Sequence, residues 1–228
     1  MNLDEAYELL NSNEKSVLIA GGLFLRLQKT SYSVIIDLET LNLNYIKEEG
    51  NFFRIGSMTS LREIEKSNLP KGIIESVMQI SGVGVRNIAT LGGSICGRYP
   101  FSDINIALMA HDARLVFHKS GEMPIVDFIH NGITEKDILV EVKFKKSSFS
   151  TTKYYKKVYN DFSLVNASMA DNRLVIGARP GRGVIVEDIS ELSDVEFKTD
   201  IRASAEYRRD LAKYLVEEIM KEKMAYGS

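Results

Sequence analysis

The feature that most constrains this chain is a glycine-rich segment, residues 81–103, with the sequence SGVGVRNIATLGGSICGRYPFSD. Flexible linkers are polar, whereas this segment interleaves its glycines with apolar residues, namely Val83, Val85, Ile88, Leu91 and Ile95. Glycine lets a backbone turn sharply and approach other atoms closely. Because the segment shows no convincing helical period, we predict loops around short strands, folded tightly against a core.

The composition is that of a globular protein, with 44% hydrophobic and 26% charged residues. A length of 228 residues allows one large domain or two small ones. The 29 basic and 31 acidic residues nearly cancel, so no strong field attracts nucleic acid or an anionic membrane. We therefore predict no nucleic-acid partner and no membrane insertion.

Cys96 is the only cysteine, so this chain alone can build neither a disulfide nor an iron–sulfur cluster nor a Cys-rich zinc site. The first ten residues lack the basic region and apolar stretch of a signal peptide. The longest apolar run, residues 17–25, is much shorter than the ~20 residues of a membrane span. These observations lead us to expect a cytoplasmic protein.

Apolar periodicity predicts a mixed order of helices and strands, opening with a βαβ-like unit. Strands are expected at residues 16–20, 34–37, 45–48, 52–55, 114–118, 138–144 and 174–177. Helices are expected at residues 3–10, 23–29, 73–81 and from about residue 200, with shorter ones beginning after the N-caps Ser60 and Ser102.

A Ser/Thr/Lys-rich stretch at residues 145–153 follows the strand at 138–144 and has only weak periodicity. Such composition is typical of a connection between domains. We therefore predict an N-terminal domain at 1–148, with subdomains of about 1–55 and 56–148, and a C-terminal domain at 149–228.

Catalytic and metal-binding patterns are absent from the sequence. The three histidines, His111, His118 and His130, form no HExxH pattern, and neither a GxSxG elbow nor a Walker A motif occurs. The start of a dinucleotide fingerprint at residues 82–84 lacks its third glycine and follows a predicted helix instead of a strand. We predict no catalytic side chain and no metal site.

Two glycine pairs are better candidates for binding: Gly21-Gly22 directly after a predicted strand, and Gly92-Gly93. A diphosphate needs several backbone N–H donors at close range, and a residue without Cβ lets the main chain come near. Glycine pairs often only make turns, but two such loops can hold one diphosphate from both sides. The cluster of Arg179 and Arg182 with nearby glycines also permits an anion site, but a hairpin turn explains it as well and is the preferred interpretation.

Three motifs include or follow these pairs: LIAGG at 18–22, VRNIATLGGSI at 85–95 with PFSD at 100–103, and DIRASAEYRR at 200–209. In this order they resemble the FAD-binding medium subunits of the molybdenum hydroxylase family, which includes xanthine dehydrogenase and aerobic carbon monoxide dehydrogenase. The resemblance implies an α+β fold: a two-subdomain FAD-binding domain of the vanillyl-alcohol oxidase (PCMH) type, followed by a small α/β C-terminal domain.

The same resemblance implies FAD as the cofactor and assigns residues to its parts. The adenosine and diphosphate path is matched by Leu18, Ile19, Ala20, Gly21, Gly22, Leu23 and Leu25, and the facing side by Ala89, Thr90, Gly93 and Ser94. The ribityl chain and flavin edge are matched by Cys96, Gly97, Ser102 and Asp103, and positions near the adenine or flavin by Ile138 and Leu139. An aromatic or lysine side chain is expected to approach the flavin ring, with Tyr155 and Lys157 as candidates.

In the family, a molybdopterin-binding large subunit oxidises the substrate, [2Fe–2S] clusters in a small subunit carry the electrons, and FAD delivers them to NAD⁺ or another acceptor. The resemblance therefore implies an electron-transfer subunit of a hetero-oligomeric oxidoreductase. Two departures stand out: Leu23 replaces a small polar residue of the first loop, and the chain is shorter than typical members. They leave open an assembly subunit with weak or no FAD binding, and a self-sufficient flavoprotein reductase.

Overall fold

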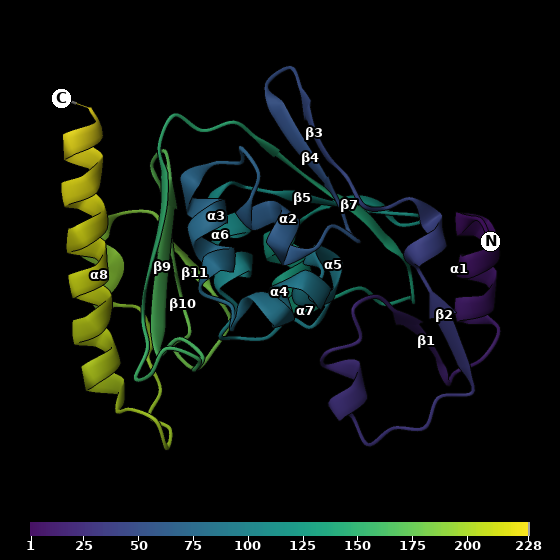
Figure 1. Cartoon of the computed structure of the whole chain (residues 1–228). Coiled ribbons are helices and arrows are strands. Elements are labelled where there is room, and N and C mark those ends of the chain that lie inside the picture. Colours follow the sequence, from purple (N-terminus) through teal and green to yellow (C-terminus); the bar gives the residue numbers. More distant parts are fainter. Residues whose placement is uncertain (228) are drawn as a thin grey trace.

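The computed structural model describes residues 1–227 and shows a mixed α+β fold, as the sequence predicts (Figure 1). An N-terminal unit pairs β1 (Ser16–Ile19) in parallel with β2 (Val34–Asp37), and α1 (Leu3–Asn11) packs against both strands. Where the sequence predicts a helix at 23–29, only one 3₁₀ turn forms, η1 (Leu25–Leu27). The unit has a small core of its own, which includes Ala6, Leu10, Ile36, Leu43 and Ile138.

The central sheet has five antiparallel strands in the order β3-β4-β7-β5-β6. Their bounds are β3 (Ile46–Glu49), β4 (Phe52–Gly56), β5 (Arg114–Phe117), β6 (Gly121–Pro124) and β7 (Leu139–Lys145). The β3–β4 hairpin pairs with β7, so these two strands belong to the same sheet as the later part of the N-terminal domain. A second 3₁₀ turn, η2 (Glu39–Leu41), leads from the N-terminal unit toward this sheet.

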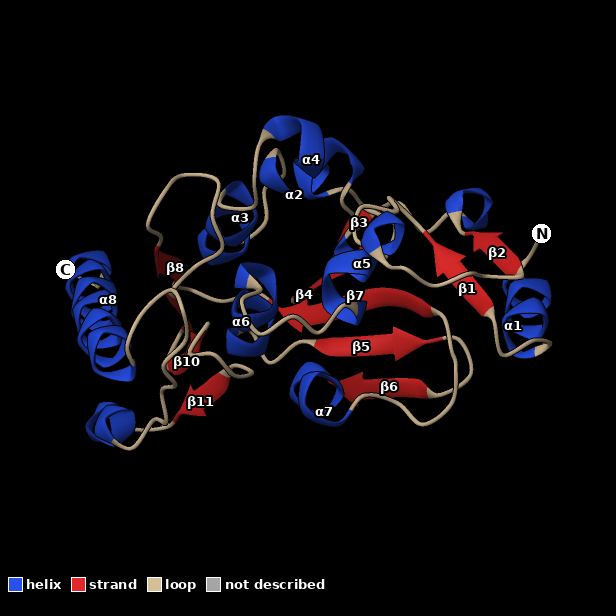
Figure 2. Cartoon of the chain, turned by 90° about the horizontal axis from the view of Figure 1, so that it is seen from below, coloured by secondary structure: helices blue, strands red, loops and turns tan. Residues whose placement is uncertain are grey.

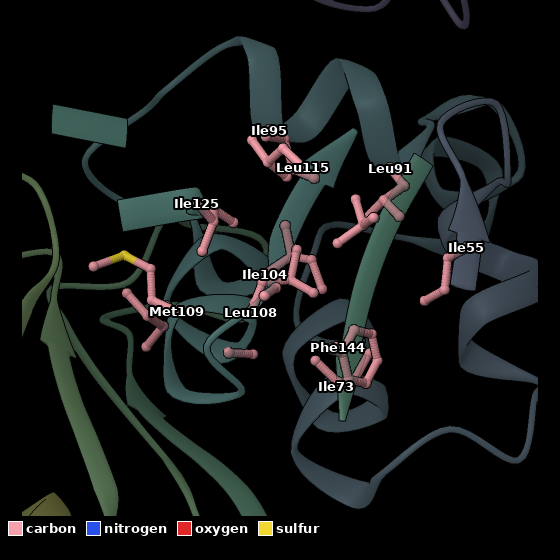
Figure 3. Packing of buried hydrophobic residues seen from close by; sticks show 14 of the residues in the cluster. Ile55, Ile73, Leu91, Ile95, Ile104, Leu108, Met109, Leu115, Ile125 and Phe144 are labelled. Carbon is pink, nitrogen blue, oxygen red and sulfur yellow. The ribbon is translucent and has the colours of Figure 1, made fainter. Parts of the chain in front are cut away.

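The N-terminal domain also contains the helices α2 (Leu61–Glu65), α3 (Lys71–Met78), α4 (Val83–Ile88), α5 (Leu91–Cys96), α6 (Asp103–Ala110) and α7 (Ile125–Asn131). Of these, α5 and α7 pack on strands of the central sheet, whereas α3 and α6 lie against a second, C-terminal sheet (Figures 1 and 2). Every residue of α6 is buried, because helices and both sheets surround it. Figure 3 shows side chains of α6, such as Ile104 and Leu108, in the same cluster as Phe144 of β7 and Ile73 of α3.

The C-terminal sheet is antiparallel in the order β11-β10-β9-β8. It consists of β8 (Ser150–Tyr155), β9 (Val165–Ala170), β10 (Arg173–Gly177) and β11 (Val184–Val186). The long helix α8 (Ala205–Tyr226) covers one face and α3 and α6 cover the other, so all six residues of β9 are buried. A 3₁₀ segment, η3 (Ile189–Ser193), connects to α8. No helix within residues 1–227 is long and apolar enough to cross a bilayer.

The structure corrects the prediction of strands in residues 81–103, which form the helices α4 and α5 instead. Tertiary contacts stabilise these short elements: Thr90 caps α5 by accepting from the amide of Gly93, and the amide of Gly92 donates to Ser57 O at 2.7 Å. A Cβ placed on Gly92 would stand 2.9 Å from that oxygen. Glycine is therefore needed for close packing of a helix, not for a strand bulge.

The Ser/Thr/Lys-rich stretch contains a strand, β8, which the sequence does not predict. Its hydroxyls are buried and bonded to α3: Thr152 Oγ1 donates to Gly72 O at 2.8 Å, and Thr151 Oγ1 donates to Glu75 at 2.9 Å. Lys153 pairs with Glu222 of α8 at 2.6 Å. The polar residues thus join the C-terminal sheet to helices on both of its faces.

Candidate functional site

The loop that follows β1 holds the first glycine pair in a conformation suited to bind an anion. Gly22 has φ = +67°, and the amides of Gly21, Gly22 and Leu23 donate to no other atom of residues 1–227. Successive free amides on such a turn form a concave surface that attracts negative charge. The loop can therefore offer hydrogen bonds to a phosphate group.

Gly21 brings this loop against the second glycine segment. A Cβ on Gly21 would stand 1.8 Å from the carbonyl oxygen of Ile88, the last residue of α4. Only glycine permits that approach. The first loop and the start of α5 consequently face one another across a short gap.

The second glycine pair, Gly92-Gly93, does not offer free amides to a ligand, although the sequence predicts that both pairs do. The amides of Leu91, Gly92 and Gly93 donate to Thr59 O, Ser57 O and Thr90 Oγ1. Gly93 is exposed and Ser94 half-buried, and both line the space in front of the first loop. The second pair therefore shapes a wall, while the free backbone donors come from the first loop.

Between the two loops lies a cleft of about 590 Å³. This volume falls within the ~300–1,000 Å³ range of small-molecule sites. The cleft brings together most residues that the sequence assigns to FAD: Leu18, Ile19, Ala20, Gly21, Gly22, Leu23, Leu25, Ala89, Thr90, Gly93, Ser94, Cys96, Gly97, Ser102, Asp103 and Leu139.

Three assigned residues lie elsewhere. Ile138 is fully buried in the core of the N-terminal unit. Tyr155 contacts Tyr207 of α8 through their hydroxyls at 3.3 Å, and Lys157 is exposed. Lys156, between the two candidates, lines the cleft instead. Side chains alternate along an extended chain, so Tyr154 and Lys156 face α3 while Tyr155 faces α8.

One end of the cleft carries buried polar groups around Asp103, the first residue of α6. Its Oδ1 accepts from Ser163 Oγ at 2.7 Å and from Asn166 Nδ2 at 2.6 Å. Burial raises the pKa of Asp103, and these two hydrogen bonds and the charge of Lys156 oppose that rise. Asp103 thus joins the N-terminal domain to β9 and the loop before it at this end of the cleft.

Four aromatic rings form a continuous row along the same cleft. The ring centroids of Phe24 and Tyr99 are 4.6 Å apart, those of Tyr99 and Phe101 5.3 Å, and those of Phe101 and Phe162 3.9 Å. All four residues line the cleft. The row runs from the first glycine loop to the loop after β8 and offers stacking surfaces for a planar ring.

Three further residues, Lys156, Asp161 and Phe162, follow β8 and line the cleft. The sequence gives only a weak signal for them: Lys156 belongs to a run of lysines, for which a solvated face is the default interpretation and a partner or cofactor contact the second. Asp161 pairs with Arg202 at 2.8 Å, which lowers the pKa of the Asp161 carboxyl and links that loop to the segment before α8. The motif at 200–209 therefore acts in part by holding a cleft loop in place.

Cys96 is exposed toward the cleft, while the protein packed around its thiol raises the pKa to about 12. A thiol with that pKa is protonated at neutral pH and is a poor nucleophile. Within residues 1–227 no cluster of His, Cys, Asp or Glu is arranged to hold a metal ion.

The arginines that the sequence offered as an anion site make backbone contacts. Arg179 donates to Arg182 O at 2.9 Å and to Glu196 O at 2.7 Å, and Arg182 donates to His130 O. These bonds brace the β10–β11 turn, in agreement with the hairpin interpretation.

Comparison with known proteins gives a consistent result. A family model described as the FAD binding domain in molybdopterin dehydrogenase matches residues 1–144. The glyceraldehyde dehydrogenase medium chain of Sulfolobus acidocaldarius is 26% identical over an alignment of 267 residues, which covers 97% of this chain and 95% of the relative. The xanthine dehydrogenase FAD-binding subunit of Escherichia coli O157:H7 is 25% identical over 274 residues, covering 98% and 94%.

Solved structures confirm the predicted fold. A carbon monoxide dehydrogenase chain from Hydrogenophaga pseudoflava superposes with a TM-score of 0.87 at 20% identity, covering 99% of this chain and 95% of that chain. A chain of quinoline 2-oxidoreductase from Pseudomonas putida 86 gives a TM-score of 0.83 at 19% identity, covering 97% and 93%.

Proposed function

Since the chain belongs to the family of FAD-binding medium subunits of molybdopterin dehydrogenases, we propose that it holds FAD in the cleft between its two glycine loops. Its partners are a molybdopterin-binding large subunit and a small subunit with [2Fe–2S] clusters. When bound, FAD would supply the redox chemistry by which electrons pass from those clusters to NAD⁺ or another acceptor. The chain is thus the electron outlet of an oxidoreductase complex.

One observation carries the proposal: the free amides of Gly21, Gly22 and Leu23 lie on a loop pressed against the segment that leads into α5. A diphosphate is the part of FAD that such donors recognise. Leu23 supplies no side-chain hydrogen bond, but its backbone donor does not depend on the side chain. Loss of the usual polar residue therefore leaves the main-chain contacts intact.

The remaining lining residues suit the other parts of FAD. Leu18, Leu38 and Leu139 give the adenosine an apolar surface at the side of the N-terminal unit. Ser102 and Asp103 line the cleft beside the aromatic row and would face the ribityl chain and the flavin edge. FAD, when bound, supplies the redox chemistry, and the chain positions it, excludes water from it and adjusts its electrostatic surroundings.

Two other functions are distinguished by experiment. An assembly subunit would keep this fold without binding FAD, and a self-sufficient reductase would oxidise or reduce its own substrate. The cleft contains no histidine, and its thiol is protonated, which does not favour the second alternative.

The test uses the purified full-length chain. We expect a yellow protein with flavin absorbance, or one that becomes yellow after incubation with FAD and desalting, and expect acid-released flavin to be FAD. A protein that stays colourless after incubation supports the assembly subunit, and rapid turnover of a substrate by the isolated chain supports the reductase. Copurification with a molybdopterin-type chain and a chain of eight cysteines tests the complex.

A further inference from the structure

Lys156 is a half-buried lysine at the aromatic end of the cleft, directly after β8. Its ammonium donates one hydrogen bond, to the main-chain oxygen of Gln79 at the C-terminal end of α3, and lies 5.2 Å from the centre of the Tyr154 ring. The ammonium makes no other hydrogen bond and no ion pair with residues 1–227. Two of its three N–H groups are therefore available to a ligand.

The neighbouring carboxylates do not neutralise this charge by direct pairing. Asp103 and Asp161 are the acids that act on Lys156, but Asp103 accepts from Ser163 and Asn166, and Asp161 pairs with Arg202. Burial lowers the pKa of Lys156, and the two carboxylates oppose that effect. A partly desolvated cation without an ion-pair partner thus faces the cleft, where its field is stronger than in water.

We propose that Lys156 raises the reduction potential of the bound FAD by placing an unpaired positive charge at the flavin end of the cleft. The inference rests on the proposed function, because it requires FAD in this cleft. Two electrons and one proton convert neutral oxidised flavin into a reduced form with one negative charge. A nearby cation stabilises the reduced form more than the oxidised form, so it makes reduction more favourable.

A purely structural role for Lys156 makes a different prediction. Its bond to Gln79 O places a cation at the end of α3, which stabilises a helix by itself. If Lys156 had only that role, replacing it would lower thermal stability and leave the reduction potential of the flavin unchanged. The reduction potential therefore separates the two roles.

The test is Lys156→Gln in the FAD-loaded full chain, with Lys157→Gln as the matched control because Lys157 is exposed and lies outside the cleft. Dithionite titration against a reference dye measures the two-electron potential. In Lys156→Gln we expect the affinity for reduced FAD to fall by about tenfold relative to the affinity for oxidised FAD. This corresponds to a decrease of about 30 mV in the two-electron reduction potential. Lys156→Arg should restore the potential, and Lys157→Gln should retain it.

An unchanged potential in Lys156→Gln, or an equal fall in Lys157→Gln, overturns the inference alone. A wild-type chain that takes up no FAD overturns the proposed function and this inference with it, and is recognised before any potential is measured. Should Lys156→Gln fail to fold, Lys156→Met keeps an unbranched side chain and removes its charge, and we expect the same fall in the potential. An unchanged potential in Lys156→Met also overturns the inference.

Discussion

Gly21→Ala tests the contact that brings the two loops together. The added Cβ would stand 1.8 Å from Ile88 O, whereas ordinary contacts begin at 3.4 Å. The loop after β1 and the end of α4 must therefore separate by about 1.6 Å. The neighbouring atom is a main-chain oxygen, so no flexible side chain can move aside.

The size of the effect follows from the hydrogen bonds that this shift removes. A hydrogen bond to a charged group contributes about 1.5–3 kcal/mol, and the loop offers three free amides, those of Gly21, Gly22 and Leu23. Loss of even one corresponds to FAD affinity reduced by roughly 10- to 100-fold. Overpacking costs a further ~1–3 kcal/mol of folding stability.

The assay compares FAD binding, by flavin fluorescence titration, and thermal unfolding in Gly21→Ala and Gly84→Ala. Gly84 is the matched control because it lies inside α4, close to Ile88 in sequence, and a Cβ there meets nothing within 4 Å. We expect Gly84→Ala to bind FAD normally and to be slightly more stable, since alanine favours helices by ~1 kcal/mol. Wild-type FAD affinity in Gly21→Ala would refute the two-loop model of the site.

Three further predictions concern the remaining parts of the fold. Burial lowers the pKa of His111 to about 4, so between pH 6.5 and 4 the unfolded chain binds more protons than the folded chain. The free energy of unfolding therefore has its full value above pH 6.5 and falls by about 3 kcal/mol as the pH decreases through this range. His111→Asn should flatten this pH dependence in urea unfolding. The chain has no tryptophan, so Phe162→Trp places the only tryptophan in the aromatic row, and we expect added FAD to quench its fluorescence, whereas a tryptophan introduced by Tyr226→Trp at the far end of α8 should be quenched less. Thr90→Ala removes the cap of α5 and should lower stability by ~1 kcal/mol in thermal unfolding, with weaker FAD binding.

Local sequence signals predict the first loop well because its chemistry lies in consecutive residues. A short strand followed by Gly21-Gly22 is enough to predict a sharp turn with free amides. The helical spacing of α1, the hairpin of β3 and β4, and the Ser102 cap of α6 are equally local, and the structure shows each of them.

The errors concern elements that depend on distant contacts. The segment at 81–103 lacks helical periodicity, yet Ser57 and Thr59 supply the oxygens that fix the first turn of α5. The hydroxyls of β8 suggest a linker until their partners in α3 are known. Composition likewise identifies the stretch that holds Tyr155, Lys156 and Lys157 but not which of these side chains lines the cleft.

The cleft depends on both domains, although the family model ends at residue 144. Lys156, Asp161 and Phe162 lie beyond that point, and they close the aromatic end that the N-terminal domain leaves open. Phe162 continues the row of rings that begins at Phe24, so a ligand stacked along that row contacts both domains. Ligand binding then stabilises the relative position of the domains. Residues beyond the family model are thus part of the cleft, and under the proposed function they contribute to the FAD site.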